Sequence, residues 1–341
     1  MEAASIPGGD RALPARSPLA RLPDKLLRYA LTLLAGLILA LIVFFFVRLV
    51  GEARPAFAKA GVLGFAFDNN WTPSAERFGA LPLVLGTLIT SSLALIIGVP
   101  IAIATAIYAT ELCPIRLRTG LTVLVELLAA VPSVVYGLWG IFFLAPKLQG
   151  TEQWFADRLS FIPFIGGGLV TIPNYFITGL VLAIMILPIV SAISREVMST
   201  VPADHKEAAL GLGATRWEMI RIAVVPYCRA GIVGGAMLGL GRAIGETIAV
   251  TILIGDAPKL GSQLFGQGYS LAAVVANEFG EAQGVHRSAL FAAGLVLFVL
   301  TLLVNGVARG LVVRSARSTR QSGPTPGMGA SVLVADTAAG A

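Results

Sequence analysis

The chain has 341 residues, of which 56% are hydrophobic and 13% are charged. The charged share is about half of that in an ordinary soluble domain, and the mean hydropathy of +0.83 indicates a protein that crosses a membrane several times. Two cysteines and two histidines, far apart, argue against a disulfide framework and a metal site. The net charge of +6 would suit nucleic acid, but in a membrane protein it more often reflects basic cytoplasmic loops.

Six segments are apolar over the ~20 residues that a helix needs to cross the hydrocarbon core. We therefore predict an all-α polytopic membrane protein with six transmembrane helices. The first segment could be a secretory signal, but its apolar run exceeds the ~7–15 residues of a signal core, which favours an uncleaved anchor. The predicted spans are Tyr29–Val50, Leu81–Ala109, Gly120–Ala145, Leu169–Ile193, Cys228–Ile254 and Ser288–Ala308.

Lysine and arginine are shared unevenly between the two alternate sets of loops. Fifteen lie in the set that includes both termini and seven lie in the other set. The positive-inside rule therefore predicts that both termini are cytoplasmic. We expect a disordered tail over 1–28, a six-span domain over 29–310 that contains a cytoplasmic loop at 199–226, and a second disordered tail over 311–341.

The loop before the predicted fifth span has a helical pattern of its own. Asp204 and Glu207 are spaced as a capping box, and so are Thr215 and Glu218. Gly213 lies between them, where a helix can stop in a left-handed turn. These signals predict two short amphipathic helices joined by a glycine turn, the second ending at a proline. A helical hairpin on the membrane surface explains the pattern equally well.

Two opposite charges interrupt the predicted fifth span. Arg242 lies thirteen residues beyond Arg229, about 20 Å along a helix and so at mid-membrane depth. Its spacing of four from Glu246 places both on one helical face, where they partly neutralise each other. Exposure to lipid would cost about 2.5–3.5 kcal/mol for each charge.

The two charges are either a structural ion pair or part of a path for an anion. The planar guanidinium of Arg242 suits a tetrahedral oxyanion, and a nearby carboxylate would soften the attraction and permit release. Glu126 in the predicted third span is a weaker candidate for the same path, because it is shallow enough to reach water.

The cytoplasmic loop resembles the EAA loop of ABC importer permeases. The residues that match its spacing are Glu207, Ala208, Ala209, Gly213 and Pro226. Ala223 and Val225 replace the usual Ile and Leu but remain apolar. The resemblance implies a coupling helix that docks on a separate ATPase. The sequence has no Gly-Lys dipeptide and hence no phosphate loop, so ATP would be bound and hydrolysed by a partner subunit and this chain would carry no cofactor.

Three segments, GLGRAIGETIAV, Val125–Pro146 and Leu180–Met198, resemble the PstC-type permease of phosphate-specific ABC importers. The resemblance implies a type I ABC importer permease in a bacterial inner membrane that forms half of a phosphate path. It also implies a heterodimer with a sister permease, two ATP-binding subunits and an extracytoplasmic phosphate-binding protein, with no role for nucleic acid.

Three other functions remain open at this stage. The Arg-x-x-Gly-Glu pattern also resembles sulfate and molybdate permeases, although the run Pro132–Gly137 favours phosphate. A non-transporting scaffold would have little reason to bury Arg242 and Glu246. A membrane-embedded enzyme would need a convergent set of His, Asp or Cys residues, which the sequence does not offer.

Overall fold

The computed structural model describes residues 22–162, 170–258 and 263–320. The chain divides into two compact units, Met1–Gly51 and Glu52–Ala341. The described part of the first unit is most of helix α1 (Leu22–Ala60). This helix is long and apolar enough to cross a membrane. Residues 1–21 and 321–341, which make up much of the two predicted tails, lie outside the described ranges.

The second unit is almost entirely helical. After the end of α1 come a short helix, a two-stranded antiparallel hairpin in which Trp71 pairs with Phe78, and then a series of helices. The elements are α2 (Val62–Phe67), β1 (Trp71–Thr72), β2 (Arg77–Phe78), α3 (Leu81–Ile107), α4 (Ile115–Ala130), α5 (Ser133–Trp139), α6 (Ala145–Arg158), α7 (Tyr175–Ser199), α8 (Ala203–Gly211), α9 (Arg216–Met219), α10 (Val225–Gly245), α11 (Ile248–Ile254), α12 (Leu271–Glu278) and α13 (Gly284–Arg320).

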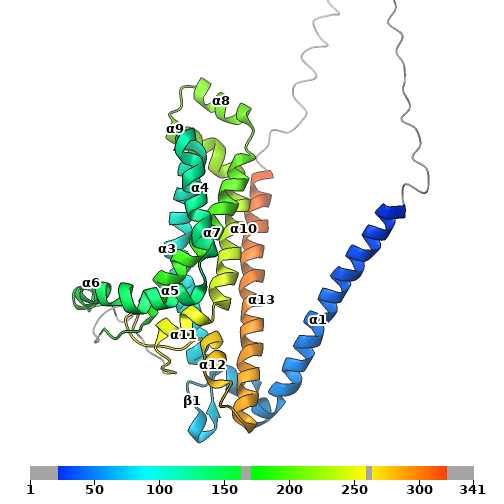
Figure 1. Cartoon of the computed structure of the whole chain (residues 1–341), viewed down its shortest axis with the longest axis vertical. Helices are drawn as coiled ribbons and strands as arrows, with labels where there is room; N and C mark the ends of the chain where they lie inside the picture. The colour runs from blue at the N-terminus through cyan, green and yellow to red at the C-terminus, as the bar shows by residue number, and fades with distance from the viewer. Residues whose placement is uncertain (1–21, 163–169, 259–262, 321–341) are drawn as a thin grey trace, which may run out of the picture. The chain divides into compact units, whose positions relative to one another are not determined.

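Helices α3, α7, α10 and α13 lie side by side and form the body of this unit (Figure 1). Small residues let the backbones approach, as is typical of membrane helices. A Cβ atom on Gly179 of α7, for example, would lie 2.5 Å from the side chain of Leu93 on α3. Helix α7 is the most deeply packed of the candidate spans, with 61% of its apolar window buried.

Within the described residues, five helices are long and apolar enough to span a membrane, and a sixth candidate is a bent pair of helices. The predicted fold class is confirmed, but the third span is not the straight helix over Gly120–Ala145 that the sequence predicted. The run Ile115–Ala130 meets Ser133–Arg158 at 91°. Pro132 causes the bend, because proline drives the residue before it out of the helical region, and Val131 is extended with ψ of 126°.

The predicted fifth span, Cys228–Ile254, is also wrong in shape. Helix α10 ends at Gly245, Glu246 is extended with ψ of 127°, and α11 begins at Ile248. At the other end the helical run starts at Arg216, so the proline at position 226 does not end the second loop helix as expected. A π turn over Ile220–Val224 precedes that proline, and its i→i+5 pairing accommodates a residue that lacks an N–H.

The other boundaries differ less. Helix α7 begins at Tyr175 rather than Leu169, because Asn174 caps it by accepting the N–H of Ile177 at 2.9 Å. Helix α13 continues to Arg320, beyond the predicted end at Ala308.

Buried apolar side chains form two separate clusters. The main core joins α3, α5, α7, α11, α12 and α13. A second cluster, which we call the loop-side core, lies at the end where α8 and α9 are found (Figure 1). Its buried members are Ala106, Met198, Val201, Ala209, Met219, Ile220, Val224, Cys228 and Ile232. The loop helices are thereby packed against α3, α7 and α10 rather than lying free on a membrane surface.

Candidate functional site

Arg242 lies in the last turn of α10 and its side chain is exposed. It lines an open groove of about 600 Å³ between α7, α10 and α13. The other lining residues are Ile189, Gly234, Met237, Leu238, Gly241 and Asn305. A guanidinium and an amide therefore face an otherwise apolar groove, and the guanidinium is a group that could bind an anion there.

Glu246 does not share a helical face with Arg242, because the helix breaks between α10 and α11. Among the ion pairs formed by the described residues, none joins these two side chains. The Oε1 atom of Glu246 instead accepts the N–H of Ala249, 3.4 Å away, at the start of α11. The predicted pairing on one helical face is therefore wrong, and the carboxylate stabilises the first turn of α11.

Tyr136 is a buried polar residue at the bend that the sequence did not indicate. Helix α5 packs closely on α11, where a Cβ on Gly137 would lie 2.9 Å from Ile252. This packing puts α5, and with it Tyr136, against the helix that follows the break after Arg242, and the charge of Arg242 contributes to the electrostatic environment of the phenol. Its hydroxyl donates to the carbonyl oxygen of Leu128 at 2.8 Å. The Pro132–Gly137 run contained this tyrosine, but the bend that places it is not visible in an apolar pattern.

Glu126 has a different partner. Its Oε1 atom lies 3.2 Å from the guanidinium of Arg195, so α4 and α7 are joined by an ion pair. The glutamate is 58% exposed, whereas Arg195 is 15% exposed. No contact among the described residues brings Glu126 to Arg242, so its place on a transport path stays a prediction.

The predicted glycine turn in the loop has the geometry of a Schellman motif. Gly213 has φ of +87°, its N–H donates to the carbonyl of Leu210, and the N–H of Ala214 donates to that of Ala209. These are the two bonds that satisfy the end of a helix. The backbone conformation favours glycine because a Cβ would be strained at this φ.

One of the two predicted capping boxes is present. Thr215 and Glu218 cap each other's backbone at the start of α9, whereas α8 starts after Pro202 with no side-chain cap, so Asp204 does not act as the predicted cap. Glu207 and Ala208 are exposed on α8, and Ala209 is buried in the loop-side core.

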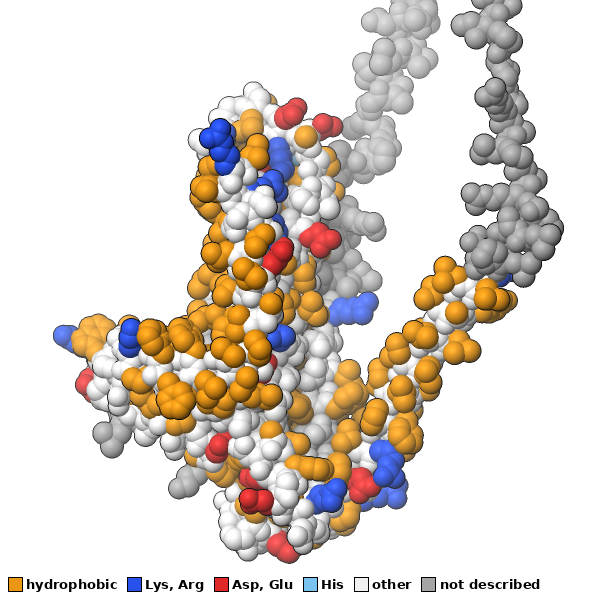
Figure 2. Space-filling view, viewed as in Figure 1, with side chains coloured by type: hydrophobic (Ala, Val, Ile, Leu, Met, Phe, Trp, Pro, Cys, Tyr) orange, Lys and Arg blue, Asp and Glu red, His pale blue; other side chains and the backbone are white. Residues whose placement is uncertain are grey.

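The end of the unit that carries α8 and α9 exposes both apolar and charged groups. Leu212 is 90% exposed and Trp217 is 62% exposed, and Pro226 is exposed on the first turn of α10. Figure 2 shows acidic and basic side chains around the same end. Exposed leucine and tryptophan beside a helical turn are typical of a surface that another protein covers.

At the opposite end, a hydrogen-bonded cluster of Trp71, Glu278 and His286, which we call the Trp71–Glu278 hub, joins the hairpin to two helices. Trp71 of the hairpin donates from Nε1 to Glu278 of α12 at 3.0 Å, and Nε2 of His286 on α13 lies 2.8 Å from the same carboxylate. Burial raises the pKa of Asp256 and, more strongly, that of the Tyr269 hydroxyl nearby. These contacts tie the hairpin, α12 and α13 together at the end away from α8.

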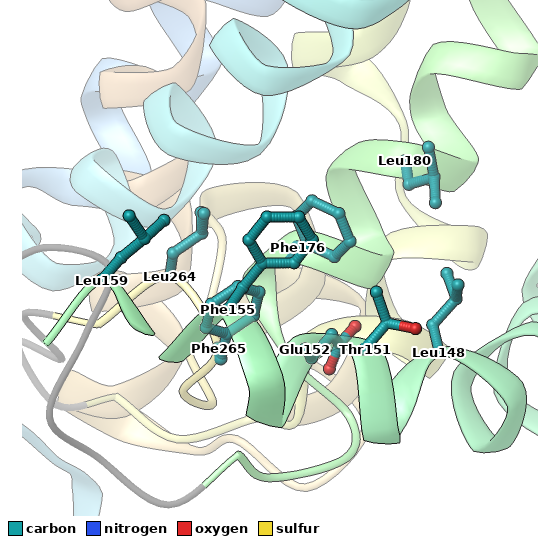
Figure 3. A pocket seen from close by; sticks show the side chains of 9 residues that line it. All are labelled: Leu148, Thr151, Glu152, Phe155, Leu159, Phe176, Leu180, Leu264 and Phe265. Atoms are coloured by element: carbon teal, nitrogen blue, oxygen red, sulfur yellow. The ribbon is translucent and has the colours of Figure 1, made fainter. Parts of the chain in front are cut away.

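A further cavity between α6, α7 and the segment around Leu264 is apolar (Figure 3). Its one carboxyl belongs to Glu152, which is fully buried and accepts a hydrogen bond from the side chain of Asn174 at 2.9 Å. Because Asn174 also caps α7, this glutamate supports the start of that helix. None of the described residues that line this cavity is a lysine or an arginine.

Comparison with known proteins assigns the family. The profile of the family described as "Binding-protein-dependent transport system inner membrane component" matches residues 98–317. The phosphate transport system permease protein PstC of Pasteurella multocida is 48% identical over 74% of this chain and 80% of its own length. PstC of Mesorhizobium japonicum is 46% identical over 79% of this chain and 85% of its own length. PstC of Xylella fastidiosa (strain Temecula1) is 37% identical over 92% of this chain and 96% of its own length.

The chain belongs to the PstC family. It is therefore a multi-pass permease component of an inner-membrane ABC transporter. The predicted resemblance is confirmed over almost the whole described chain, including the segments that hold Arg242 and the loop.

Solved structures support the same fold. A bacterial ABC transporter involved in the import of the acidic polysaccharide alginate matches this PstC-family chain with a TM-score of 0.57 at 19% identity, covering 87% of this chain and 98% of that one. A second structure shows a bacterial alginate ABC transporter in complex with a periplasmic protein that binds an alginate pentasaccharide. It matches with a TM-score of 0.58 at 20% identity, covering 86% of this chain and 98% of that one. The architecture of an ABC importer permease is thus shared with proteins of low sequence identity.

The left-handed turn generates a first testable prediction. Gly213→Ala should destabilise the end of α8 by about 1–2 kcal/mol, because alanine strains at positive φ. Hydrogen exchange of the α8 amides in the purified protein should then become roughly 5–30 times faster.

Gly211→Ala is the matched control for that prediction. Both glycines have open space where the added methyl group would lie, but Gly211 is helical, so alanine there should slow exchange or leave it unchanged. Equal exchange rates in the two variants would show that the turn does not depend on the backbone of Gly213.

Proposed function

We propose that this chain is the transmembrane permease subunit of an ATP-driven importer for inorganic phosphate and that Arg242 lines its half of the path. The observation that carries the proposal is the exposed guanidinium in a groove between α7, α10 and α13. A charge in an apolar span is costly unless it faces protein or a water-filled path. We propose phosphate as the substrate because the relatives named above are phosphate transport permeases.

The chemistry of the groove suits a transient anion site. The guanidinium offers a planar fork of donors to the oxygens of phosphate. Glu246 lies four positions away at the helix break and forms no ion pair with Arg242, so the donors of the guanidinium stay available. One guanidinium in an open groove would bind an anion weakly enough for it to leave, as conduction requires.

The groove is open on one side, which suits a sister permease as the partner of this chain in the membrane. One chain lines the groove from one side with the residues around Arg242, and a sister permease would close it in a heterodimer. Lipid would cover the remaining apolar faces, such as that of α4, where Leu124 and Leu127 are exposed.

The two ends of the unit suit two further kinds of partner. The exposed Leu212 and Trp217 beside α8 and α9 would be covered by one of two ATP-binding subunits, with Glu207, Ala208, Ala209, Gly213 and Pro226 forming the coupling segment. ATP binding and hydrolysis would belong to those subunits. The opposite end, with the Trp71–Glu278 hub, would receive the extracytoplasmic phosphate-binding protein.

Sulfate and molybdate are the alternative substrates. They are tetrahedral oxyanions as phosphate is, and a single guanidinium binds all three through the same donors. The preference for phosphate therefore rests on the relatives and on the Pro132–Gly137 run. A non-transporting scaffold would not require Arg242 to face a groove.

Arg242→Gln tests the transport path. Loss of one charge-assisted contact of about 1.5–3 kcal/mol should lower phosphate uptake by at least about tenfold in reconstituted vesicles. Assembly and basal ATP hydrolysis should survive, since no ion pair of Arg242 with Glu246 is broken.

Arg118→Gln is the control for this substitution, because it removes the same charge from an exposed position on α4. Its uptake should match the wild type. Near-normal uptake by Arg242→Gln at equal membrane abundance would exclude Arg242 from the path.

The proposed orientation places both termini and α8 in the cytoplasm, as the Lys and Arg distribution predicts. Cys113 is partly exposed at the same end as the loop, whereas Cys228 is buried. A membrane-impermeant thiol reagent should therefore label Cys113 in inside-out vesicles but not in intact cells, and should label Cys228 from neither side. Cys113→Ser identifies the labelled site, and labelling of Cys113 from outside would reverse the orientation.

A further inference from the structure

An ion pair far along the chain from Arg242 joins α8 to the end of α3. The Nζ atom of Lys206 donates to Oε1 of Glu111 at 2.6 Å. The side chain of Glu111 is 7% exposed and that of Lys206 is 23% exposed. Charges so little exposed are tolerated when they are paired, so the pair fixes the position of α8 against α3.

The glutamate stands on an unusual piece of backbone. Residues Tyr108–Leu112 form a π turn that extends α3, and π turns are frequent at functional sites. The hydroxyl of Thr110, beside the glutamate, lies 3.7 Å from the sulfur of Met198 on α7. The turn that carries Glu111 is thus packed against a second helix of the bundle.

Among the described residues, two other side chains of α8 make contacts with the bundle. Ala209 is buried in the loop-side core, and the ring of His205 meets that of Tyr227 on α10 edge-on, with 5.9 Å between the ring centroids. Asp204 and Glu207 are exposed. Ala106 of α3, Ala209 of α8 and Cys228 of α10 are buried together in the loop-side core. The ion pair therefore lies where these three helices meet.

We propose that the Lys206–Glu111 pair transmits movement of α8 into α3, with both residues acting as positioning residues for transport. The inference rests on the proposed function, in which an ATPase moves α8. The apolar contact of Ala209 is small and has no fixed direction, and His205 contacts α10 rather than α3. A short ion pair between little-exposed groups holds α8 and the end of α3 at one distance and angle. Displacing α8 should therefore displace the end of α3, which packs along α7, one of the helices that line the groove.

The test uses the complete importer in phosphate-containing vesicles and measures phosphate transported per ATP hydrolysed. Lys206→Met and Glu111→Gln should each assemble with wild-type basal hydrolysis, but the ratio should fall by at least about fivefold, the lower end of typical coupling between sites. The charge swap Lys206→Glu with Glu111→Lys should recover at least half of the ratio.

The matched controls each remove one charge from an exposed side chain outside α8 and the hairpin, Arg118 on α4 and Glu196 on α7. Arg118→Met and Glu196→Gln should leave the ratio unchanged. The proposal is overturned if Lys206→Met and Glu111→Gln both keep the wild-type ratio of phosphate transported to ATP hydrolysed. It is also overturned if assembly, hydrolysis and uptake fall together so that this ratio stays constant. A swap that assembles but stays uncoupled overturns it as well. If instead the wild-type complex does not couple phosphate transport to ATP hydrolysis, it is the proposed function that is wrong. That outcome is distinct from the failure of the inference about the Lys206–Glu111 pair.

Discussion

A helix inside a membrane can break only where other groups satisfy the backbone amides and carbonyls that the break sets free. The architecture depends on this constraint at two places. At the α4–α5 bend, the hydroxyl of Tyr136 donates to the carbonyl of Leu128. At the α10–α11 break, the carboxylate of Glu246 accepts the N–H of Ala249. Side chains thus replace the missing helical bonds and make both bends stable.

The two breaks lie next to each other because α5 packs on α11. The second break ends α10 three residues after Arg242, whose guanidinium lines a groove between α7, α10 and α13. A straight fifth span would have paired Arg242 with Glu246 along one helical face and neutralised both. The bent span separates them, and the site keeps a positive charge that a passing anion can use.

Composition and periodicity were sufficient for the class of protein, the positions of most spans and the helix–glycine–helix loop. They failed where one residue changes the direction of the chain. Pro132 and Glu246 lie in segments whose apolar composition continues on both sides, so the pattern indicated single straight spans. Tyr136 was missed for the same reason, since only the bend puts α5, and with it Tyr136, against α11. The Lys206–Glu111 pair joins residues 95 positions apart, and no local pattern predicts such a contact.

The central claim, that this chain belongs to an importer for phosphate, is tested most directly by asking which anion drives the complete complex. ATP hydrolysis by the purified importer, reconstituted with all its partner subunits, can be measured with phosphate, sulfate and molybdate supplied in turn. We predict that phosphate stimulates hydrolysis at least about tenfold more than either of the other anions, a preference of about 1.4 kcal/mol for the assembled importer. Equal or greater stimulation by sulfate or molybdate would contradict the claim.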